Sequence, residues 1–249
     1  MTIVSKERRS DSSFVETITH GFTAAAGSTI RPAASHWHMV IVKHPGARQL
    51  LIVGPLASAG IASWGEGAEI VWIKFRLGTF MPHLPTRNFL NSETALPEAS
   101  SDSFWFQGSR WQLPDHENAD TFVDRLAREE ILVRDPVVNT VLAGQPHDIP
   151  DRTIRHRFLR ATGLTQSKIR QFERAQLAVS LLEQRVSILD TVFELGYFDQ
   201  PHLTRALKHW IGYTPAQIIR NYQAVTQTCH SVQDGPETLV YDTSVLERL

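Results

Sequence analysis

The period of the apolar residues changes at residues 132–135, and this change most limits what the chain can fold into. Between about Ser35 and Leu113, apolar and polar residues alternate in short runs, which is typical of half-buried strands. After Asp135 the apolar residues recur every three to four positions, the period of amphipathic helices. Because 249 residues are enough for two domains, we predict an α+β protein of two parts. The predicted bounds are 1–134 for the first domain, 135–222 for the second and 223–249 for a C-terminal tail.

The first part contains several short strand-like runs separated by Gly and Pro. They are Trp37–Val42, Gln49–Val53, Glu69–Trp72, Ile73–Leu77 and Ser103–Gln107. Strands at this spacing predict a small antiparallel barrel or sandwich. A run with helical period follows at Asp115–Leu132, with Asp and Glu gathered at its start, where the helix dipole favours them. The first domain is therefore predicted to be β-rich, with one helix.

The clearest helix signals lie between Ser187 and Trp210. Ser187 is a candidate N-cap for a helix at Ile188–Leu195, and Gly196 stands where a left-handed C-terminal residue belongs. Asp199 is a candidate N-cap for a second helix at Gln200–Trp210. The side chains predicted to be buried in the first helix are Ile188, Leu189, Val192, Phe193 and Leu195. A short helix, a glycine turn and a second helix with one basic face are typical of DNA-reading helix-turn-helix units.

A similar but less regular unit comes before it. Pro136–Leu142 is predicted to be a short helix, and Asp151 is a candidate N-cap for a helix at Arg152–Thr162 that ends at Gly163. The turn between these helices contains Pro146 and Pro150. Two helix-turn-helix units in one chain indicate a DNA-binding domain more strongly than a single basic helix does.

A longer helix is predicted between the two units, from near Thr165 to near Glu183. Eighteen helical residues span ~27 Å. That length is of the order of the ~34 Å between successive major-groove faces on one side of a duplex. The spacing therefore suits two reading helices placed one turn of DNA apart.

The residues from Gly163 to Arg220 resemble the AraC/XylS family of bacterial transcription regulators. The positions that carry the resemblance are Arg174, Ala175, Leu181, Leu182, Ile188, the run Gly196–Arg205, Lys208, Gly212 and Thr214–Ala216. The resemblance implies a sequence-specific DNA-binding domain with two helix-turn-helix units, so double-stranded DNA is an expected partner. It also implies an N-terminal sensing or dimerising domain, commonly a cupin-like β-barrel. A small-molecule effector and a homodimer are therefore further expected partners.

Carried over position by position, the resemblance implies base contacts from both reading helices. They are Arg152, Arg155 and His156 in the first helix and Gln200, Pro201, His202, Thr204 and Arg205 in the second. These roles agree with the usual pairing of Arg with guanine and Gln with adenine. Lys208 and Arg160 lie further along their helices and are expected to contact phosphates, which position a protein without specifying sequence. Pro201 lacks an N–H, so only shape or an apolar contact is expected from it.

His36 and His38, with His44 six residues later, resemble part of a cupin metal site. Residues two apart in a strand face the same way, so both could reach one ion. No Glu follows at the spacing that such barrels use, so we favour a structural role or simple surface exposure, without a metal or other cofactor. The favoured interpretation is a regulator that is not an enzyme. A metal-dependent barrel enzyme with an appended DNA-binding domain is the alternative, and a ligand-binding module that tunes DNA affinity is a third.

The net charge of −1 over the whole chain conceals an uneven distribution. Residues 1–134 hold 13 basic and 14 acidic residues, 135–222 hold 11 and 8, and 223–249 hold 1 and 4. The second domain is thus modestly basic, with a net charge of +3 and four His. This small charge predicts weak non-specific DNA binding, so recognition is expected to need both reading helices together or a dimer.

Two further features limit the class of protein. The single Cys, Cys229, excludes a disulfide scaffold. The most apolar stretch, Leu50–Trp64, is interrupted by Gly and Pro and is shorter than the ~20 residues of a membrane span. We therefore expect a soluble, cytoplasmic protein without a membrane partner.

Overall fold

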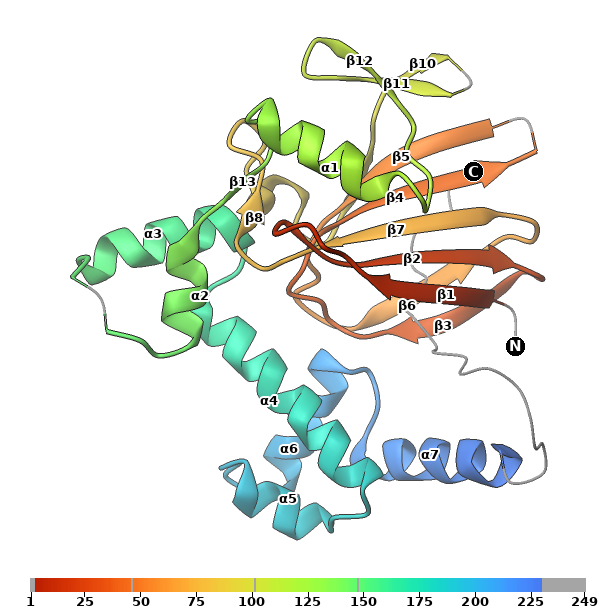
Figure 1. The fold of residues 1–249 in the computed structure, drawn as a ribbon. Coiled ribbons are helices and arrows are strands. Elements are labelled where there is room, and N and C mark those ends of the chain that lie inside the picture. The colour runs from red at the N-terminus through yellow and green to blue at the C-terminus, as the bar shows by residue number, and fades with distance from the viewer. Residues whose placement is uncertain (1–2, 46, 101, 147, 230–249) are drawn as a thin grey trace.

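The computed structural model of the chain describes residues 3–45, 47–100, 102–146 and 148–229. A strand-rich N-terminal part is followed by helices that extend away from it (Figure 1). All paired strands in the described residues are antiparallel. The prediction of an α+β protein, with a strand-rich first part and a helical second part, is therefore confirmed.

The main sheet has six strands in the order β1-β2-β7-β4-β5-β9. Their bounds are β1 Ile3–Arg9, β2 Val15–Thr23, β7 Glu69–Phe75, β4 His38–His44, β5 Ala47–Val53 and β9 Glu93–Ala95. The remaining strands are β3 Gly27–Arg31, β6 Gly60–Trp64, β8 Thr79–Phe80, β10 Glu98–Ser100, β11 Ser103–Phe106, β12 Ser109–Gln112 and β13 Val133–Arg134, with a short 3₁₀ helix, η1, at Thr86–Phe89. The smaller sheets pair β10-β11-β12, β13-β8 and β3-β6, so the hydrogen bonding of the described residues forms four open sheets and no closed barrel.

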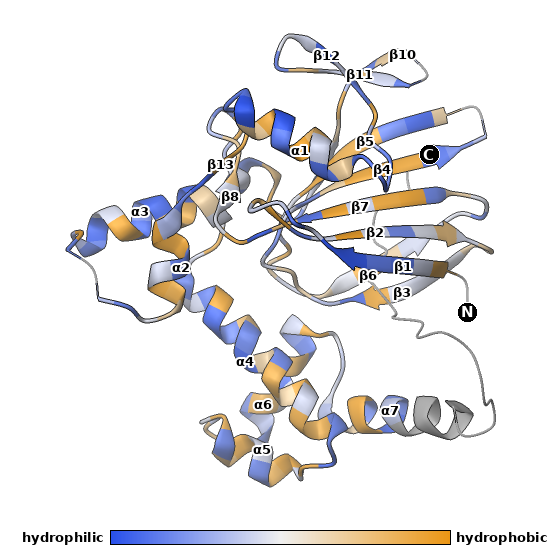
Figure 2. Cartoon of the chain, viewed as in Figure 1, coloured by the Kyte–Doolittle hydropathy of each residue, from blue (hydrophilic) through white to orange (hydrophobic). Residues whose placement is uncertain are grey.

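The central strands of the main sheet are buried on both faces. In β4, Met39 and Ile41 belong to one apolar core, while Val40 and Val42 belong to a second core with Trp64 of β6. This explains why the central strands are continuous apolar runs. Figure 2 shows the resulting contrast between apolar β4 and β7 and the hydrophilic edge strand β1.

Strands β1, β2 and β3 were not predicted from the sequence, which placed the first strand after residue 35. The charged run Ser5–Arg9 lies at the sheet edge, where one face of the strand stays partly exposed. An edge strand needs few apolar residues because its partner supplies the hydrogen bonds. Its seven-residue register with β2 exists only in the folded sheet.

Helix α1 covers Ala119–Arg128, shorter than the predicted Asp115–Leu132. The Asp115 carboxylate accepts hydrogen bonds from the backbone N–H groups of Glu117 and Asn118, which holds residues 115–118 in a turn. The apolar side of α1 packs into the first core, where Phe122 meets Trp111 edge-on at 5.9 Å.

Five helices of the C-terminal part match the predicted positions closely, and a sixth follows them. They are α2 Pro136–Leu142, α3 Asp151–Thr162, α4 Gln166–Glu183, α5 Ile188–Glu194, α6 Gln200–Trp210 and α7 Pro215–Cys229. Ser187 and Asp199 cap α5 and α6 through their side chains as predicted, and Thr165 caps α4. Gly163 and Gly196 adopt φ values of 71° and 66°, the left-handed conformation expected after a helix. Residues 223–229 of the predicted tail belong to α7, and residues 230–249 lie outside the described residues.

Two local predictions are wrong. Asp151 is the first residue of α3 and Pro150 occupies the cap position, so the Asp151 carboxylate favours the helix through the dipole alone. Leu189 and Phe193 of α5 are 60% and 80% exposed instead of buried. The reason is that the seven-residue α5 packs through Thr191, Val192 and the partly buried Ile188, and its other side faces solvent.

The helices contact the strand-rich part in two places. Phe158 of α3 shares an apolar core with Phe80 of β8 and with Val138 of α2, and the Thr86 hydroxyl donates to the Ala161 carbonyl at 3.2 Å. At the end of α6, the N–H groups of Ala33 and Ala59 donate to the carbonyls of Trp210 and His209, at 2.7 and 2.8 Å. Both helix-turn-helix units are thus attached to the N-terminal part.

Candidate nucleic-acid interface

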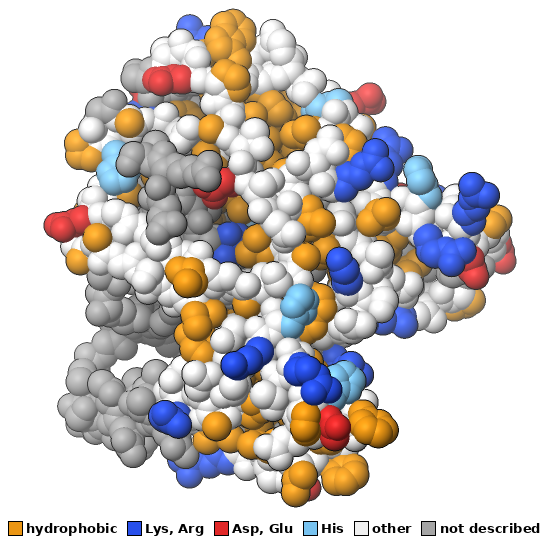
Figure 3. All heavy atoms as spheres, turned by 180° about the vertical axis from the view of Figure 1, so that it is seen from behind, with side chains coloured by type: hydrophobic (Ala, Val, Ile, Leu, Met, Phe, Trp, Pro, Cys, Tyr) orange, Lys and Arg blue, Asp and Glu red, His pale blue; other side chains and the backbone are white. Residues whose placement is uncertain are grey.

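The exposed side of α3 carries basic residues that are free to reach a partner. Arg152, Arg155 and His156 are exposed and have no hydrogen bond or ion pair with other described residues. The opposite side of the helix, with Ile154 and Phe158, is buried. Figure 3 shows Lys and Arg side chains gathered over the helical units on the face that it presents.

Two other Arg residues of α3 are engaged within the protein. The Arg157 guanidinium donates twice to the Asp135 carboxylate, at 2.9 and 2.7 Å, and this raises the pKa of Arg157. Because Asp135 also caps α2, the pair ties α3 to the start of α2. Arg160, the expected phosphate contact, lies over the Phe80 ring at 5.2 Å, which still leaves the residue exposed.

The residues expected to read DNA in α6 fall into two groups. Gln200, Pro201 and Arg205 are exposed, and so is the phosphate candidate Lys208. Thr204 is half-buried.

His202 is also half-buried and takes part in the local turn. Its Nδ1 accepts a hydrogen bond from the Phe198 N–H at 3.3 Å, and its ring meets Tyr197 edge-on at 5.3 Å. The backbone N–H of His202 donates to the carboxylate of Asp199, the cap of α6, at 2.6 Å. A base contact from His202 would therefore have to use the other ring nitrogen.

Helix α4 is the physical link between the two units. Its eighteen residues span ~27 Å, and Ile169 packs with α3 whereas Phe172 and Leu182 pack with α5 and α6. Phe172 meets Trp210 at the end of α6 at 6.3 Å. One continuous helix therefore carries contacts from both units, which holds them at a set separation.

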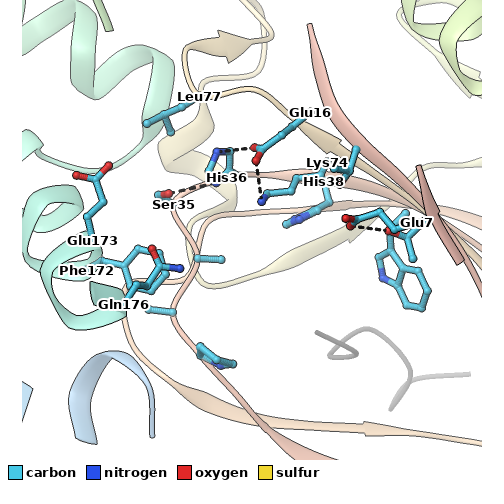
Figure 4. Close-up of a pocket in the computed structure, with 16 residues that line it drawn as sticks. Glu7, Glu16, Ser35, His36, His38, Lys74, Leu77, Phe172, Glu173 and Gln176 are labelled. Carbon is cyan, nitrogen blue, oxygen red and sulfur yellow. Dashed lines mark hydrogen bonds and ion pairs between the residues drawn. The ribbon is translucent and has the colours of Figure 1, made fainter. Parts of the chain in front are cut away.

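The predicted histidine motif lies in the strand-rich part, just before and at the start of β4. His36 pairs with the Glu16 carboxylate at 3.0 Å, and Lys74 reaches the second oxygen of the same carboxylate at 3.3 Å (Figure 4). His38 lies on the neighbouring strand β4. Among the described residues, no three His, Cys, Asp or Glu side chains converge as a metal site would require. Sequence inspection missed Glu16 because it precedes the motif by 20 positions and joins it only through the β2–β7–β4 pairing.

Hydrogen bonding by His36 lowers the pKa of Glu16 to about 2, with Lys74 adding to the effect against the opposing effect of burial. Burial lowers the pKa of His38 well below its ordinary value, and the nearby Arg31 contributes. The two shifts act on stability in different ranges of pH. His38 stays neutral in the folded chain, and Glu16 stays ionised.

We expect the free energy of unfolding to fall as the pH drops below about 6.5, because unfolded His38 then takes up a proton that the folded state excludes. One such group contributes at most about 1.4 kcal/mol per pH unit. Below about pH 4.5, Glu16 takes up a proton in the unfolded chain but stays ionised in the folded chain. The free energy of unfolding therefore falls further until the pH nears 2. Urea denaturation at pH 7.5, 6.5 and 5.5 would show a smaller decline for His38→Gln than for the wild type. Equal declines would contradict the role of His38.

Comparison with known proteins agrees with the geometry of the helical part. The family described as a helix-turn-helix domain matches residues 148–221. A protein of Escherichia coli (strain K12) named "Uncharacterized HTH-type transcriptional regulator YidL" is 38% identical over 69 residues, which cover 27% of this chain and 23% of that protein. The chain therefore matches about a quarter of the length of this relative. No solved structure matches the chain significantly. None of the described helices has the length and hydropathy of a membrane-spanning segment.

Proposed function

We propose that the chain is a sequence-specific transcription regulator of the AraC/XylS type that reads two successive major-groove segments, because residues 148–221 match a helix-turn-helix domain. The observation that carries the proposal is the pair of exposed basic helix faces, on α3 and α6, joined by α4. We place the DNA-binding domain at 135–222 and the regulatory domain at 1–134. We further propose that the protein binds DNA in the cytoplasm.

In this proposal Arg152, Arg155 and His156 read bases from α3. Gln200, Pro201, His202, Thr204 and Arg205 do so from α6. Arg160 and Lys208 bind phosphates. The free guanidinium groups of Arg155 and Arg205 support base reading, because an Arg already paired within the protein would lose that pair on binding. Regulation would come from an effector or a homodimer contact in the N-terminal part.

Any homodimer contact through α1 would have to be polar. Its apolar residues are buried in the first core, and Thr121, Asp124 and Arg128 are among the residues that it exposes. A polar contact of this kind forms a weak or transient interface more often than an obligate one.

Fluorescence anisotropy with DNA from upstream of the coding sequence, against a random duplex of equal length and at matched salt, tests the proposal. The wild type should prefer the upstream duplex. Arg205→Ala should lose about 1–3 kcal/mol on that duplex alone, because a base contact discriminates between sequences. If the wild type binds both duplexes equally or neither, the proposal is wrong.

Lys208→Ala is the matched comparison on the same helix. A phosphate contact carries no sequence information, so this variant should weaken binding to both duplexes alike. The slope of log affinity against log salt should fall by about 1. A loss confined to the upstream duplex would instead make Lys208 a base-reading residue.

A further inference from the structure

Among the described residues, Phe198 is the most exposed large apolar side chain, at 90%. It stands in the turn between α5 and α6, one position before Asp199, which caps α6. An apolar residue in this position often packs against the fourth residue of the helix, which is Leu203 here. Leu203 is buried in the core of the second unit, but the exposure of Phe198 shows that its ring does not take part in that packing. The ring therefore projects from the N-terminal end of the second reading helix.

The backbone that carries this ring is fixed on both sides. Tyr197, the preceding residue, is 5% exposed and belongs to the core of the second unit. The Phe198 N–H donates to Nδ1 of His202 at 3.3 Å, and the His202 N–H donates to the Asp199 carboxylate at 2.6 Å. Only the two side-chain torsions of Phe198 remain to be ordered by a partner, so binding through the ring loses little conformational entropy.

The start of α6 is the part of the second unit that the proposed function places in a major groove. In helix-turn-helix proteins the N-terminal residues of the second helix contact base edges there. Gln200 and Pro201, the first two residues of α6, are exposed at the same end of the helix as Phe198. The ring of Phe198 thus stands beside residues that are proposed to read bases.

The chemistry of a phenyl ring limits what Phe198 can read in that groove. The ring has no hydrogen-bond donor or acceptor, so covering a phosphate or a polar base edge would remove water without replacing its hydrogen bonds. The 5-methyl group of thymine is apolar and lies in the major groove, and Phe is among the side chains that contact it. A thymine in the segment read by α6 therefore matches Phe198.

We propose that Phe198 is a specificity-determining residue whose ring packs on the 5-methyl group of one thymine in the segment read by α6. The proposal rests on the proposed function, because it requires α6 to enter a major groove. It adds an apolar contact to a set of base-reading residues that are mostly polar.

Replacing thymine by deoxyuridine tests this contact, because uracil pairs with adenine in the same way but lacks the methyl group. Each thymine of the upstream duplex is replaced in turn, and the affinity is measured by anisotropy at one salt concentration. The wild type should bind about three- to fivefold more weakly when the thymine at Phe198 is replaced, which is the effect of one lost buried methyl group. Phe198→Ala should lose this sensitivity at that position and keep the wild-type response at all others. The proposal is overturned if Phe198→Ala responds to every replacement as the wild type does, or if the wild type responds to none.

Phe193→Ala is the matched control, because Phe193 is a second exposed Phe of the same unit, 80% exposed on α5. The first helix of a helix-turn-helix unit crosses the DNA backbone and does not enter the groove. Phe193→Ala should therefore respond to every replacement as the wild type does. Loss of the same thymine sensitivity in Phe193→Ala would overturn a role specific to Phe198.

Failure of this proposal can be distinguished from failure of the proposed function. A wild type that binds the upstream and random duplexes equally would overturn the proposed function, and the role of Phe198 with it. A wild type that prefers the upstream duplex, together with unchanged responses in Phe198→Ala, would overturn the role of Phe198 alone. Phe198→Ala should unfold at the same urea concentration as the wild type, because truncation of an exposed side chain removes little packing. A changed response to deoxyuridine therefore reports on the contact with DNA.

Discussion

Replacement of Phe158 by alanine is expected to lower the free energy of unfolding by about 3–5 kcal/mol. Phe158 is 2% exposed, and its ring fills the core shared by α2, α3, α4 and β8. Alanine would leave a cavity there without disturbing helix propensity. Because the same core joins the first helix-turn-helix unit to the strand-rich part, the loss should affect both parts. Urea denaturation followed by circular dichroism and by Trp fluorescence would measure it.

Leu159→Ala is the control for this experiment. Leu159 is the next residue of α3 but is 39% exposed, so its truncation should cost less than about 1 kcal/mol. The Trp residues are concentrated in the strand-rich part, so fluorescence reports mainly on that part and circular dichroism also reports on the helices. If Phe158→Ala lowered the stability of the helices but left the Trp signal unchanged, the shared core would not couple the two parts.

The second large effect is expected from removing one base-reading Arg from each unit. Arg155→Ala and Arg205→Ala should each cost about 1–3 kcal/mol of specific binding, and the double variant about 2–6 kcal/mol. Near-additivity is expected because the two residues lie on different helices and share no partner. Anisotropy titrations of the four proteins against the upstream duplex, at one salt concentration, would measure the cycle.

If the double variant bound the upstream duplex as tightly as the single variant with the larger loss, only one unit would read the DNA. Arg128→Ala, at an exposed Arg of α1 outside both units, serves as the charge-matched control and should change affinity less than twofold. A comparable loss in Arg128→Ala would mean that general electrostatic attraction, and not base reading, carries the binding.

The helix-turn-helix units could be located from the sequence because their signals are local. Ser187 and Asp199 accept hydrogen bonds from backbone groups three residues away. Gly196 needs only its own left-handed conformation. Such contacts do not depend on the rest of the fold, so the helix bounds agreed with the structure to within a residue or two.

The strand-rich part was less predictable, since its contacts join distant residues. The charged β1 is a strand only because β2 supplies a seven-residue ladder. Leu189 and Phe193 have apolar side chains at helical spacing, yet both are exposed because no neighbouring element of the described chain covers that side of α5. A hydrophobic pattern marks which face of an element could be buried, but the neighbouring elements determine whether it is.

The candidate DNA-reading side chains show the same division. Arg152, Arg155, Arg157 and Arg160 are indistinguishable in the sequence as basic residues of one helix. Only the fold pairs Arg157 with Asp135, 22 positions earlier, and places Arg160 over Phe80. The two that remain without an internal partner are those proposed to read bases.

The sequence alone thus specified the helices of the two units and the Ser187 and Asp199 caps, because each depends on interactions within a few positions. The attachment of α6 to Ala33 and Ala59 and the Glu16–His36–Lys74 cluster depend on the tertiary structure. These contacts join residues that are 20 or more positions apart in the sequence. No local pattern encodes such contacts, since they exist only once the sheet and the helices have packed together.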